Sequence, residues 1–483
     1  MKLDYSFVEE LTALGSEVKP IKLINSRLAV FNHSLASELN LPSEWQHENH
    51  LFSAMYAEHG VLNHHPMAQK YGGHQFGQWN PELGDGRGLL LAEAIDEKKQ
   101  RWDLYLKGAG PTPYSRFADG RAVLRSTIRE YLASEALHHL GIPTSRALCL
   151  IVSDEPVYRE KQERAAKMIR VCQSHLRFGH FEYFYHSKQP KRLQNLFDYC
   201  FKYHFSECTK AESPYLAMLE KIVHDTAKLI AKWQAFGFNH GVMNTDNMSI
   251  HGITFDYGPY AFLDDFEPTF ICNHSDPQGR YSFDSQPGIG LWNLNALAQT
   301  FIPHLEIEQI KQALSSYEPT LLKEYSTLMH NKLGLLPSVL NGEANSHIIN
   351  TWLDILAVEK KDYSSSFRQL CQFDIFGDNQ SLGDQFINRE RFDEWAKHYT
   401  LALTEQSVNQ TQRQTQMRQH NPHIVLRNYL AQQVIDHAEE GNFEMFHQFI
   451  GALKKPYEDI EEYQKFSVPP PNWGKKLEIS CSS

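Results

Sequence analysis

Residues 84–140 constrain the fold more than any other stretch, because a glycine-rich turn, two strand-like runs and a helix follow one another there. After GDGRG come the apolar run GLLLAEAID, a polar EKKQR turn and WDLYLKGAG. Trp102, Leu104 and Leu106 alternate with polar residues in the last run, so the two runs predict a β-hairpin. LRSTIREYLASEALHHL (124–140) has the helical period of about 3.6 residues and ends before Gly-Ile-Pro, which predicts a helix.

The rest of the chain divides into a β-rich part and a helical part. Residues 165–181 are β-rich, whereas from about residue 190 the pattern is mostly helical, with loops at 240–290. This order predicts an α+β enzyme of two lobes with a cleft between them. We expect residues 1–200 to form the N-terminal region and β-rich lobe. Residues 201–483 should form the helical lobe and a helical C-terminal extension.

Composition excludes several classes of protein. The 483-residue chain has a net charge of −11, which argues against a general nucleic-acid binder. No apolar run approaches the ~20 residues that span a bilayer, and the N-terminus lacks a secretory apolar core. Seven cysteines without a Cys-x-x-Cys pair suit a reducing compartment. The 25 histidines include no His-Glu-x-x-His or other strong ligand spacing. We expect a cytoplasmic monomer that binds neither nucleic acid nor membrane.

GDGRG is a candidate phosphate-binding loop. Gly84 and Gly86 allow backbone N–H groups to turn toward an anion, and Arg87 adds a charged group. The motif is neither a Walker loop nor a GxGxxG that opens a helix, so alone it is typical of a glycine-rich hairpin turn. The order of the residues that follow favours the phosphate loop.

Lys107 lies on the second predicted strand, and Glu130 lies on the predicted helix after it. A glycine loop, a strand lysine and a helix glutamate follow one another in this order in protein kinases, where lysine and glutamate pair beside the phosphates. Taken singly, the two residues fit a surface lysine and an exposed acid. Their order favours a functional pair.

HGVMNTDNMSIHGITFDYG (240–258) has nearly the layout of a kinase catalytic loop, but Val242 occupies the position of the kinase's catalytic aspartate. Asn247 and Asp256 offer hard oxygen ligands for Mg²⁺ bound to a triphosphate. Asp246, next to Asn247, can act as the base toward an incoming hydroxyl. We expect MSIHGITFD to form a loop and a short strand that returns Asp256 to the site. The structural alternative is an Asx-rich turn.

Arg170 and Arg177 lie in the β-rich stretch before the helical half. Their odd spacing would place them on opposite faces of one regular strand. A turn or bulge must therefore intervene if both contact one ligand. The alternative is ordinary surface charge.

With these residues assembled, the chain resembles the selenoprotein O family (SelO, also called YdiU or UPF0061), protein adenylyltransferases with a kinase-like fold. The resemblance covers essentially the whole length. Its most specific stretches are YGGHQFGQWNPELGDGRG (71–88), KGAGPTPYSRFADGRAVLRSTIREYLASEAL (107–137), HGVMNTDNMSIHGITFDYGPYAFLDDF (240–266) and NPHIVLRNYLAQQVI (421–435).

The resemblance implies that the chain binds ATP in an orientation reversed relative to kinases. It would transfer AMP to Ser, Thr or Tyr hydroxyls of proteins, including itself, and release pyrophosphate. Asp246 would be the catalytic base, and Asn247 with Asp256 would hold Mg²⁺, with Mn²⁺ an option. The other residues implied to bind nucleotide are Gly84, Gly86, Arg87, Lys107 (paired with Glu130), Asp119, Gly120, Arg170, Arg177 and Asp256.

The resemblance also implies redox control through a cysteine near the C-terminus. Here that residue is Cys481, and Cys272 is a plausible intramolecular partner. A thiol on a flexible end can reach another thiol with little strain. The alternative is a tail cysteine without a role.

Other functions stay open on the sequence alone. A close variant would use UTP or Mn²⁺. A kinase-like phosphotransferase fits the HG…N…D layout, although Val242 counts against it. A silent nucleotide-binding pseudokinase would have no need of the metal ligands.

Overall fold

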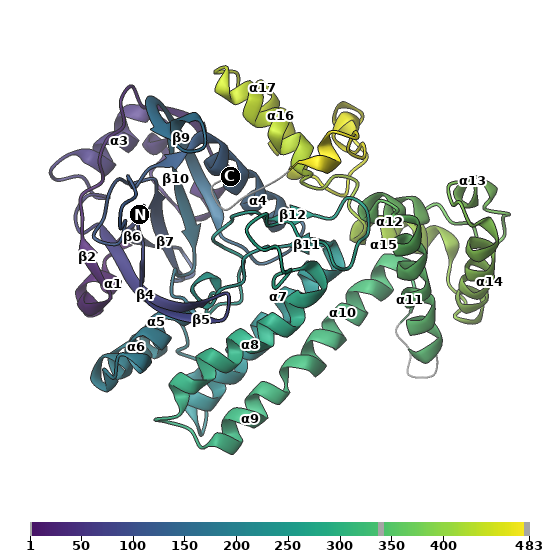
Figure 1. Cartoon of the computed structure of the whole chain (residues 1–483), viewed down its shortest axis with the longest axis horizontal. Coiled ribbons are helices and arrows are strands. Elements are labelled where there is room, and N and C mark those ends of the chain that lie inside the picture. Colours follow the sequence, from purple (N-terminus) through teal and green to yellow (C-terminus); the bar gives the residue numbers. More distant parts are fainter. Residues whose placement is uncertain (1, 337–341, 478–483) are drawn as a thin grey trace.

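The computed structural model describes residues 2–336 and 342–477 (Figure 1). A ten-stranded sheet has the strand order β2-β4-β6-β7-β10-β9-β3, with β1 beside β6, β5 beside β4 and β8 beside β10. The strands are β1 (Lys2–Asp4), β2 (Gly15–Glu17), β3 (Arg27–Phe31), β4 (Met67–Gln75), β5 (Gln78–Gly84), β6 (Gly88–Ile95), β7 (Arg101–Lys107), β8 (Ala122–Val123), β9 (Arg146–Tyr158) and β10 (Gln162–Cys172).

Helices make up most of the chain after this sheet, and in Figure 1 they extend from beside the sheet to the far end of the molecule. They are α5 (Phe178–His186), α6 (Pro190–Tyr203), α7 (Pro214–Phe236), α8 (Gln286–Ala298), α9 (Ile307–Ser315), α10 (Tyr317–Leu333), α11 (Gly342–Glu359), α12 (Tyr363–Leu370), α13 (Gln380–Gly383), α14 (Arg389–Glu405), α15 (Gln410–His420), α16 (Asn428–Glu439) and α17 (Glu444–Leu453). The predicted α+β class is confirmed. No helix in the described ranges is long and apolar enough to cross a membrane.

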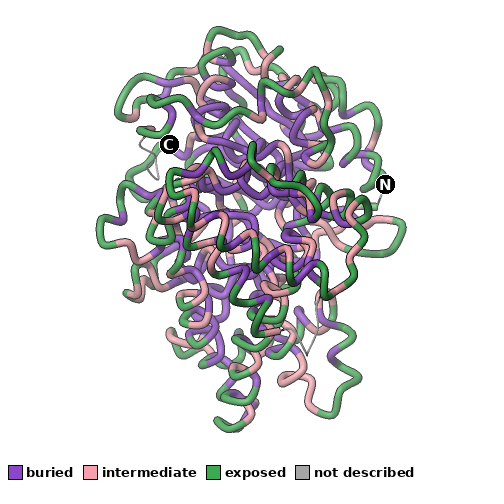
Figure 2. Tube along the Cα trace, turned by 90° about the vertical axis from the view of Figure 1, so that its right-hand side faces the viewer, coloured by how far each residue is buried: buried purple, intermediate pink, exposed green. Residues whose placement is uncertain are grey.

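Both faces of the sheet are buried. The face with Leu89, Leu91, Leu104 and Leu106 packs under α2 (His33–Glu38) and α3 (Glu48–Tyr56). Residues of the alternate register, such as Leu90, belong to the large core that continues into the helices. Figure 2 shows this core as a buried interior beneath exposed loops. Burial of one Leu side chain stabilises the fold by about 1.5–3 kcal/mol. The alternation of side chains along each strand therefore fixes which residues face α2 and α3 and which face the large core.

The predicted hairpin and helix are both present. β6 pairs antiparallel with β7, which places Gly88 opposite Lys107. The helix α4 (Leu124–His139) follows, and its C-terminal turn closes at Gly141, whose φ of +78° favours glycine. The sheet and α4 therefore hold Lys107 and Glu130 in the predicted order.

Two sequence-based predictions need correction. Residues 165–181 are not all extended, because β10 ends at Cys172 and α5 begins at Phe178. The aromatic run of α5 suggested a strand, but Phe178, Phe181 and Phe184 are buried at helical spacing. Residues 248–256 form no strand either. They make only isolated bridges, at Ser249 with Arg177 and at Thr254 with Thr144.

Candidate functional site

The segment 240–260 is a loop whose two ends are held together. α7 ends at Gly237, in the left-handed region, and leads into β11 (Phe238–Asn239). β11 pairs with β12 (Ala261–Phe262), so the loop leaves and re-enters the fold at one place. His240 Nε2 lies 3.0 Å from the carbonyl oxygen of Phe255, which fastens the loop across its middle. This geometry brings residues 246 and 256 to the β-rich side of the molecule.

A continuous chain of buried charges joins the sheet, α4 and this loop. Lys107 Nζ donates to Glu130 Oε2, and Glu130 Oε1 accepts from Arg170 Nε at 2.7 Å. Arg170 Nη1 then donates to Asp256 Oδ1 at 2.7 Å. Glu130 is fully buried, and Lys107 and Arg170 are almost so. The predicted Lys107–Glu130 pair is present, and Arg170 extends it to Asp256.

Arg177 approaches Asp256 from the other side. Its Nη1 donates to Asp256 Oδ2 and to the backbone oxygen of Asp246, the latter at 2.7 Å. β10 ends before Arg177, which is the N-cap residue of α5. The expected turn between Arg170 and Arg177 therefore exists, and both arginines meet one carboxylate.

Asp256 stays ionised in this setting. Burial opposes its charge, but Arg177 and Arg170 hold the pKa of the carboxyl well below its usual range. The backbone of Asp256 has a φ of +60°, an uncommon conformation for a residue with a side chain. Such strain persists where surrounding contacts over-determine it, as the two arginines do here.

Asp246 has contrasting surroundings. Its side chain is buried, and Oδ1 has no hydrogen-bond partner in the described part of the chain. Its Oδ2 accepts from Gln75 Nε2 at 3.4 Å. Burial raises the pKa of this carboxyl to about 7, although Arg177 acts in the opposite direction. An unpaired oxygen on a carboxyl that titrates near neutrality can accept a proton from an incoming group.

The end of β4 lies over Asp246. A Cβ on Gly73 would come within 2.8 Å of Asp246 Oδ1, so a side chain there would displace the carboxylate. The backbone N–H of His74 donates to Thr245 Oγ1 at 2.7 Å, and that of Phe76 donates to Asn244 Oδ1 at 3.2 Å. Asn244 is thus committed to structure.

Asn247 is half-buried, and within the described ranges its side chain makes no hydrogen bond. The amide oxygen of Asn247 and the carboxylate of Asp256 are oxygen donors of the kind that Mg²⁺ takes. The two residues fit a magnesium ion by their chemistry. The arginines that now hold Asp256 are themselves groups that bind phosphate.

The glycine loop contributes a residue that the sequence analysis missed. Asp85 is buried and accepts from the backbone N–H of Gln69 at 2.9 Å and from Tyr71 Oη at 3.2 Å. Its Oδ1 lies 3.8 Å from Arg177 Nη2. Burial raises its pKa to about 6. The signal available in the sequence was the position of this acid, between Gly84 and Gly86 of the predicted phosphate loop. Arg87 is exposed.

Comparison with known proteins identifies the family. The family model described as "Protein adenylyltransferase SelO" matches residues 2–454. The chain belongs to this family. Proteins described as "Protein nucleotidyltransferase YdiU" are similar over the full length: one from Pseudoalteromonas atlantica is 60% identical over 100% of both chains. One from Erwinia tasmaniensis is 46% identical over 100% of both, and one from Pseudomonas aeruginosa is 48% identical over 100% of this chain and 99% of its own.

Membership in the SelO family makes the chain a protein adenylyltransferase, and hence an enzyme that uses ATP and modifies proteins. The buried chain of charges from Lys107 to Asp256 is the part of the predicted site that the structure brings together.

Two predicted nucleotide residues lie apart from the charge chain. Asp119 is exposed and forms a two-pronged pair with Arg159, with distances of 2.8 and 2.9 Å. Gly120 has a φ of +66°, and a Cβ there would come within 2.1 Å of the Gly110 carbonyl carbon. Gly120 is therefore required by close backbone packing.

The predicted redox pair is only half visible. Cys272 is buried, with Sγ 3.8 Å from the Asn239 backbone oxygen and close to Gly241. Cys481 lies outside the described residues. The pairing of these two thiols stays a prediction.

Proposed function

We propose that this enzyme transfers AMP from ATP to Ser, Thr or Tyr hydroxyls of proteins, including its own, with the ATP reversed relative to a kinase. The observation that supports this most is the pair of buried arginines on Asp256. A departing pyrophosphate carries more charge than the ADP left by a kinase, and Arg170, Arg177 and Lys107 together can neutralise it. Arg170 and Arg177 converge on Asp256, and Arg177 also contacts the backbone oxygen of Asp246.

The fold proposed for this chemistry is the two-lobed, kinase-like one. Residues 1–200 would form the β-rich lobe, and residues 201–483 the helical lobe with its C-terminal extension. Lys107 and Arg170 reach the site from adjacent strands, β7 and β10, which pair with Met168 opposite Lys107. The nucleotide would lie against this sheet, with Gly84, Gly86 and Arg87 at its edge and Asp119 and Gly120 completing the pocket.

The acceptor hydroxyl would approach beside Asp246. Its oxygen attacks the α-phosphorus, the bond from that phosphorus to the bridging oxygen breaks, and pyrophosphate leaves. The hydroxyl proton passes to Asp246 Oδ1, which has no other partner in the described structure. A hollow of about 760 Å³, lined in part by Phe76, Arg280 and Ile289, offers room for an acceptor segment. Phe76 connects this hollow to the 240–260 loop, because its backbone N–H donates to Asn244 Oδ1.

Mg²⁺ bound by Asn247 and Asp256 would supply positive charge to the triphosphate and orient it. Arg170 and Arg177 both contact Asp256, and in the proposed reaction they would turn from the carboxylate to the phosphates of ATP. Glu130 keeps Arg170 and Lys107 in place during this exchange because it bonds to both.

Labelled ATP tests the proposal. Incubation with ATP labelled at the α- or the γ-phosphate, followed by separation of the proteins, should show label from the α position only. Label from the γ position would establish a phosphotransferase and overturn the proposal. Absence of both labels would indicate a silent nucleotide binder. Parallel reactions with UTP and with Mn²⁺ measure whether the enzyme prefers another nucleotide or ion.

We further propose that the enzyme acts as a cytoplasmic monomer and that a disulfide between Cys481 and Cys272 regulates its activity. The seven cysteines without a Cys-x-x-Cys pair support a reducing compartment. Mass spectrometry that finds no Cys481 disulfide under oxidant, together with equal activity with and without reductant, would contradict the redox proposal.

A further inference from the structure

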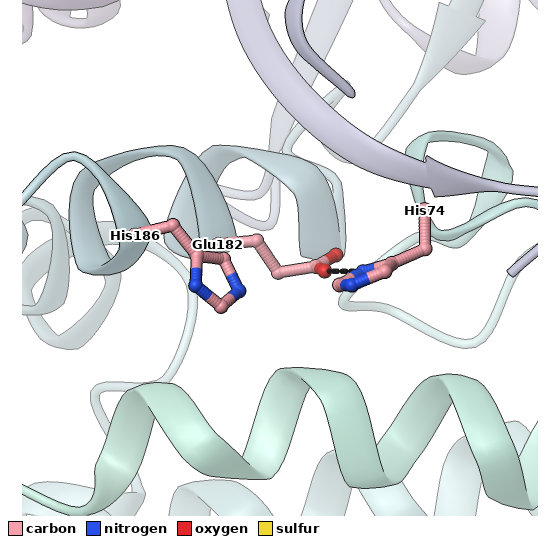
Figure 3. A group of neighbouring side chains, drawn as sticks. All are labelled: His74, Glu182 and His186. Carbon is pink, nitrogen blue, oxygen red and sulfur yellow. Dashed lines mark hydrogen bonds and ion pairs between the residues drawn. The ribbon is translucent and has the colours of Figure 1, made fainter. Parts of the chain in front are cut away.

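A second group of possible ligands lies between β4 and α5 (Figure 3). It consists of His74 from β4 and of Glu182 and His186 from α5. One ligand atom from each residue lies within 4.8 Å of the others. Figure 3 shows the Glu182 carboxylate against the His74 ring, with the His186 ring projecting from the same helix.

Glu182 is the residue that indicates a ligand. Its side chain is fully buried, and Oε1 has no hydrogen-bond partner in the described part of the chain. Oε2 lies 2.5 Å from His74 Nδ1. A buried carboxylate with one unpaired oxygen is costly, because the desolvation of that oxygen is not repaid. A cation placed between the carboxylate and the two imidazoles would remove this cost.

The types of ligand select the class of ion. Two imidazoles and one carboxylate form a known ligand set for Zn²⁺, whereas Mg²⁺ prefers oxygen donors. Glu182 and His186 are four residues apart on α5, so they project from one face of the helix. Ligand bonds of about 2.0–2.2 Å require neighbouring ligand atoms roughly 3.4 Å apart. Small side-chain rotations, with loss of the His74–Glu182 hydrogen bond, would bring the three groups to that spacing.

We propose that His74, Glu182 and His186 bind a divalent transition-metal ion of the zinc class, with water as the fourth ligand. This site is separate from the magnesium site at Asn247 and Asp256. The His74 side chain is 16% exposed, so solvent can reach the ion.

The ion would fasten β4 to α5 next to the catalytic loop. The backbone N–H of His74 donates to Thr245 Oγ1, and the preceding residue, Gly73, lies against Asp246. At the other end of the link, Arg177 is the N-cap residue of α5 and bonds to Asp256. A metal between β4 and α5 therefore holds the surroundings of both Asp246 and Asp256, although it touches neither.

The competing interpretation is a metal-free contact. His74 and Glu182 would then be a simple hydrogen-bonded pair, and His186 would pack against Trp79, with ring centroids 4.4 Å apart. The two interpretations differ in whether the purified protein binds a metal ion at these residues.

Titration of the full-length, chelator-treated protein with Co²⁺, without nucleotide, tests the proposal. A four-coordinate site with nitrogen ligands gives strong visible absorption, whereas an oxygen-only, six-coordinate site gives weak bands. We expect one equivalent of strongly absorbing Co²⁺, displaced by Zn²⁺. Absence of such a band from the wild-type protein would overturn the proposal.

Variants locate the ion. His186→Asn and Glu182→Gln should weaken Co²⁺ binding at least tenfold and abolish the rise in Tm that Zn²⁺ causes in the wild type. His186→Cys should retain binding with an altered spectrum, because a thiolate replaces the imidazole. The control is His59→Asn, which changes an exposed histidine. Equal binding by His186→Asn and the wild type would contradict the assignment, as would loss of binding in His59→Asn.

Discussion

Two buried clusters of arginine and aspartate differ in how completely they use their hydrogen-bonding capacity. In the helical part, Arg427 donates to Asp264 at 2.6 Å and to both oxygens of Asp362 at 2.7 and 3.0 Å. Asp362 also caps α12 by accepting from the Ser365 N–H. In the functional site, Arg170 and Arg177 share Asp256, while Oδ1 of the neighbouring Asp246 lacks a partner among the described residues.

The difference separates structure from function. In the Arg427 cluster one guanidinium bridges two carboxylates and the Ser365 hydroxyl, where α12 and α16 meet the loop after β12. The Asp256 cluster leaves hydrogen-bonding capacity unused, because Asp246 Oδ1 has no partner in the described part of the chain and the Asp256 backbone is strained. Similar residues therefore have different roles in the two clusters. Substitutions in the Asp256 cluster should lower the reaction rate, and substitutions in the Arg427 cluster should lower the free energy of unfolding.

The largest expected effect is on rate. Asp256→Asn removes the charge that holds the two arginines and that would bind the proposed Mg²⁺, but it keeps the shape of the side chain. AMP transfer should therefore fall by about 10³-fold or more, equivalent to ~4 kcal/mol of barrier. Transfer of α-label under single-turnover conditions measures this. Asp198→Asn, an exposed change on α6, is the control. Transfer by Asp256→Asn within tenfold of wild type would remove Asp256 from the mechanism.

Replacement of Arg427 should affect stability instead. Arg427→Leu leaves the half-buried Asp264 and Asp362 without their cation, which should cost about 3 kcal/mol of unfolding free energy, the lower end for a buried pair. Denaturant titration compares it with Arg418→Leu, an exposed change on α15. Transfer per folded molecule should stay near the wild-type value. A large loss of rate without loss of stability would erase the distinction between the clusters.

The smallest expected effect is on stability and its pH dependence, and it comes from a buried lysine that packs against aromatic rings. Lys332 on α10 lies over the rings of Phe367, Tyr363 and Phe236, the nearest at 4.4 Å. Burial lowers its pKa to about 7. Between pH 7 and about 10.5 the unfolded chain binds more protons than the native protein, so stability should rise with pH through this window.

Lys332→Met should remove that pH dependence and stabilise the protein by on the order of 2 kcal/mol at pH 7. Melting temperatures measured from pH 6.5 to 9.5 test this, with the exposed Lys311→Met as control. A variant that is less stable than wild type at every pH would show that the ring contacts outweigh the desolvation of the ammonium.

Local sequence patterns predicted much of the site. The alternation of apolar residues in β7 correctly placed Lys107 on a strand. The helical period of α4 and the helix end at Gly141 correctly placed Glu130 on a helix. The odd spacing of Arg170 and Arg177 correctly required a turn. These features depend on residues close in sequence, where periodicity and turn chemistry act.

The features that were missed depend on distant pairing. Asp85 enters the network because β4 brings Gln69 and Tyr71 beside it, and Asp246 is covered by Gly73 from the same strand. His74 meets Glu182 from more than 100 positions away. Only the four-residue spacing of Glu182 and His186 was visible as a local signal. The prediction of a strand at 248–256 is wrong. The segment forms single bridges with two separate partners, Arg177 and Thr144, in place of a continuous ladder with one neighbouring strand.

The central claim is that Asp246 takes the acceptor proton while Asp256 and its arginines hold the nucleotide. The most direct measurement is the transfer rate of Asp246→Asn beside its affinity for ATP and Mg²⁺, determined by calorimetry. The account predicts a rate lower by roughly 10²–10⁴-fold, with affinity within about threefold of the wild type. A rate that stays within a factor of about two would contradict it, as would a loss that lies entirely in nucleotide affinity.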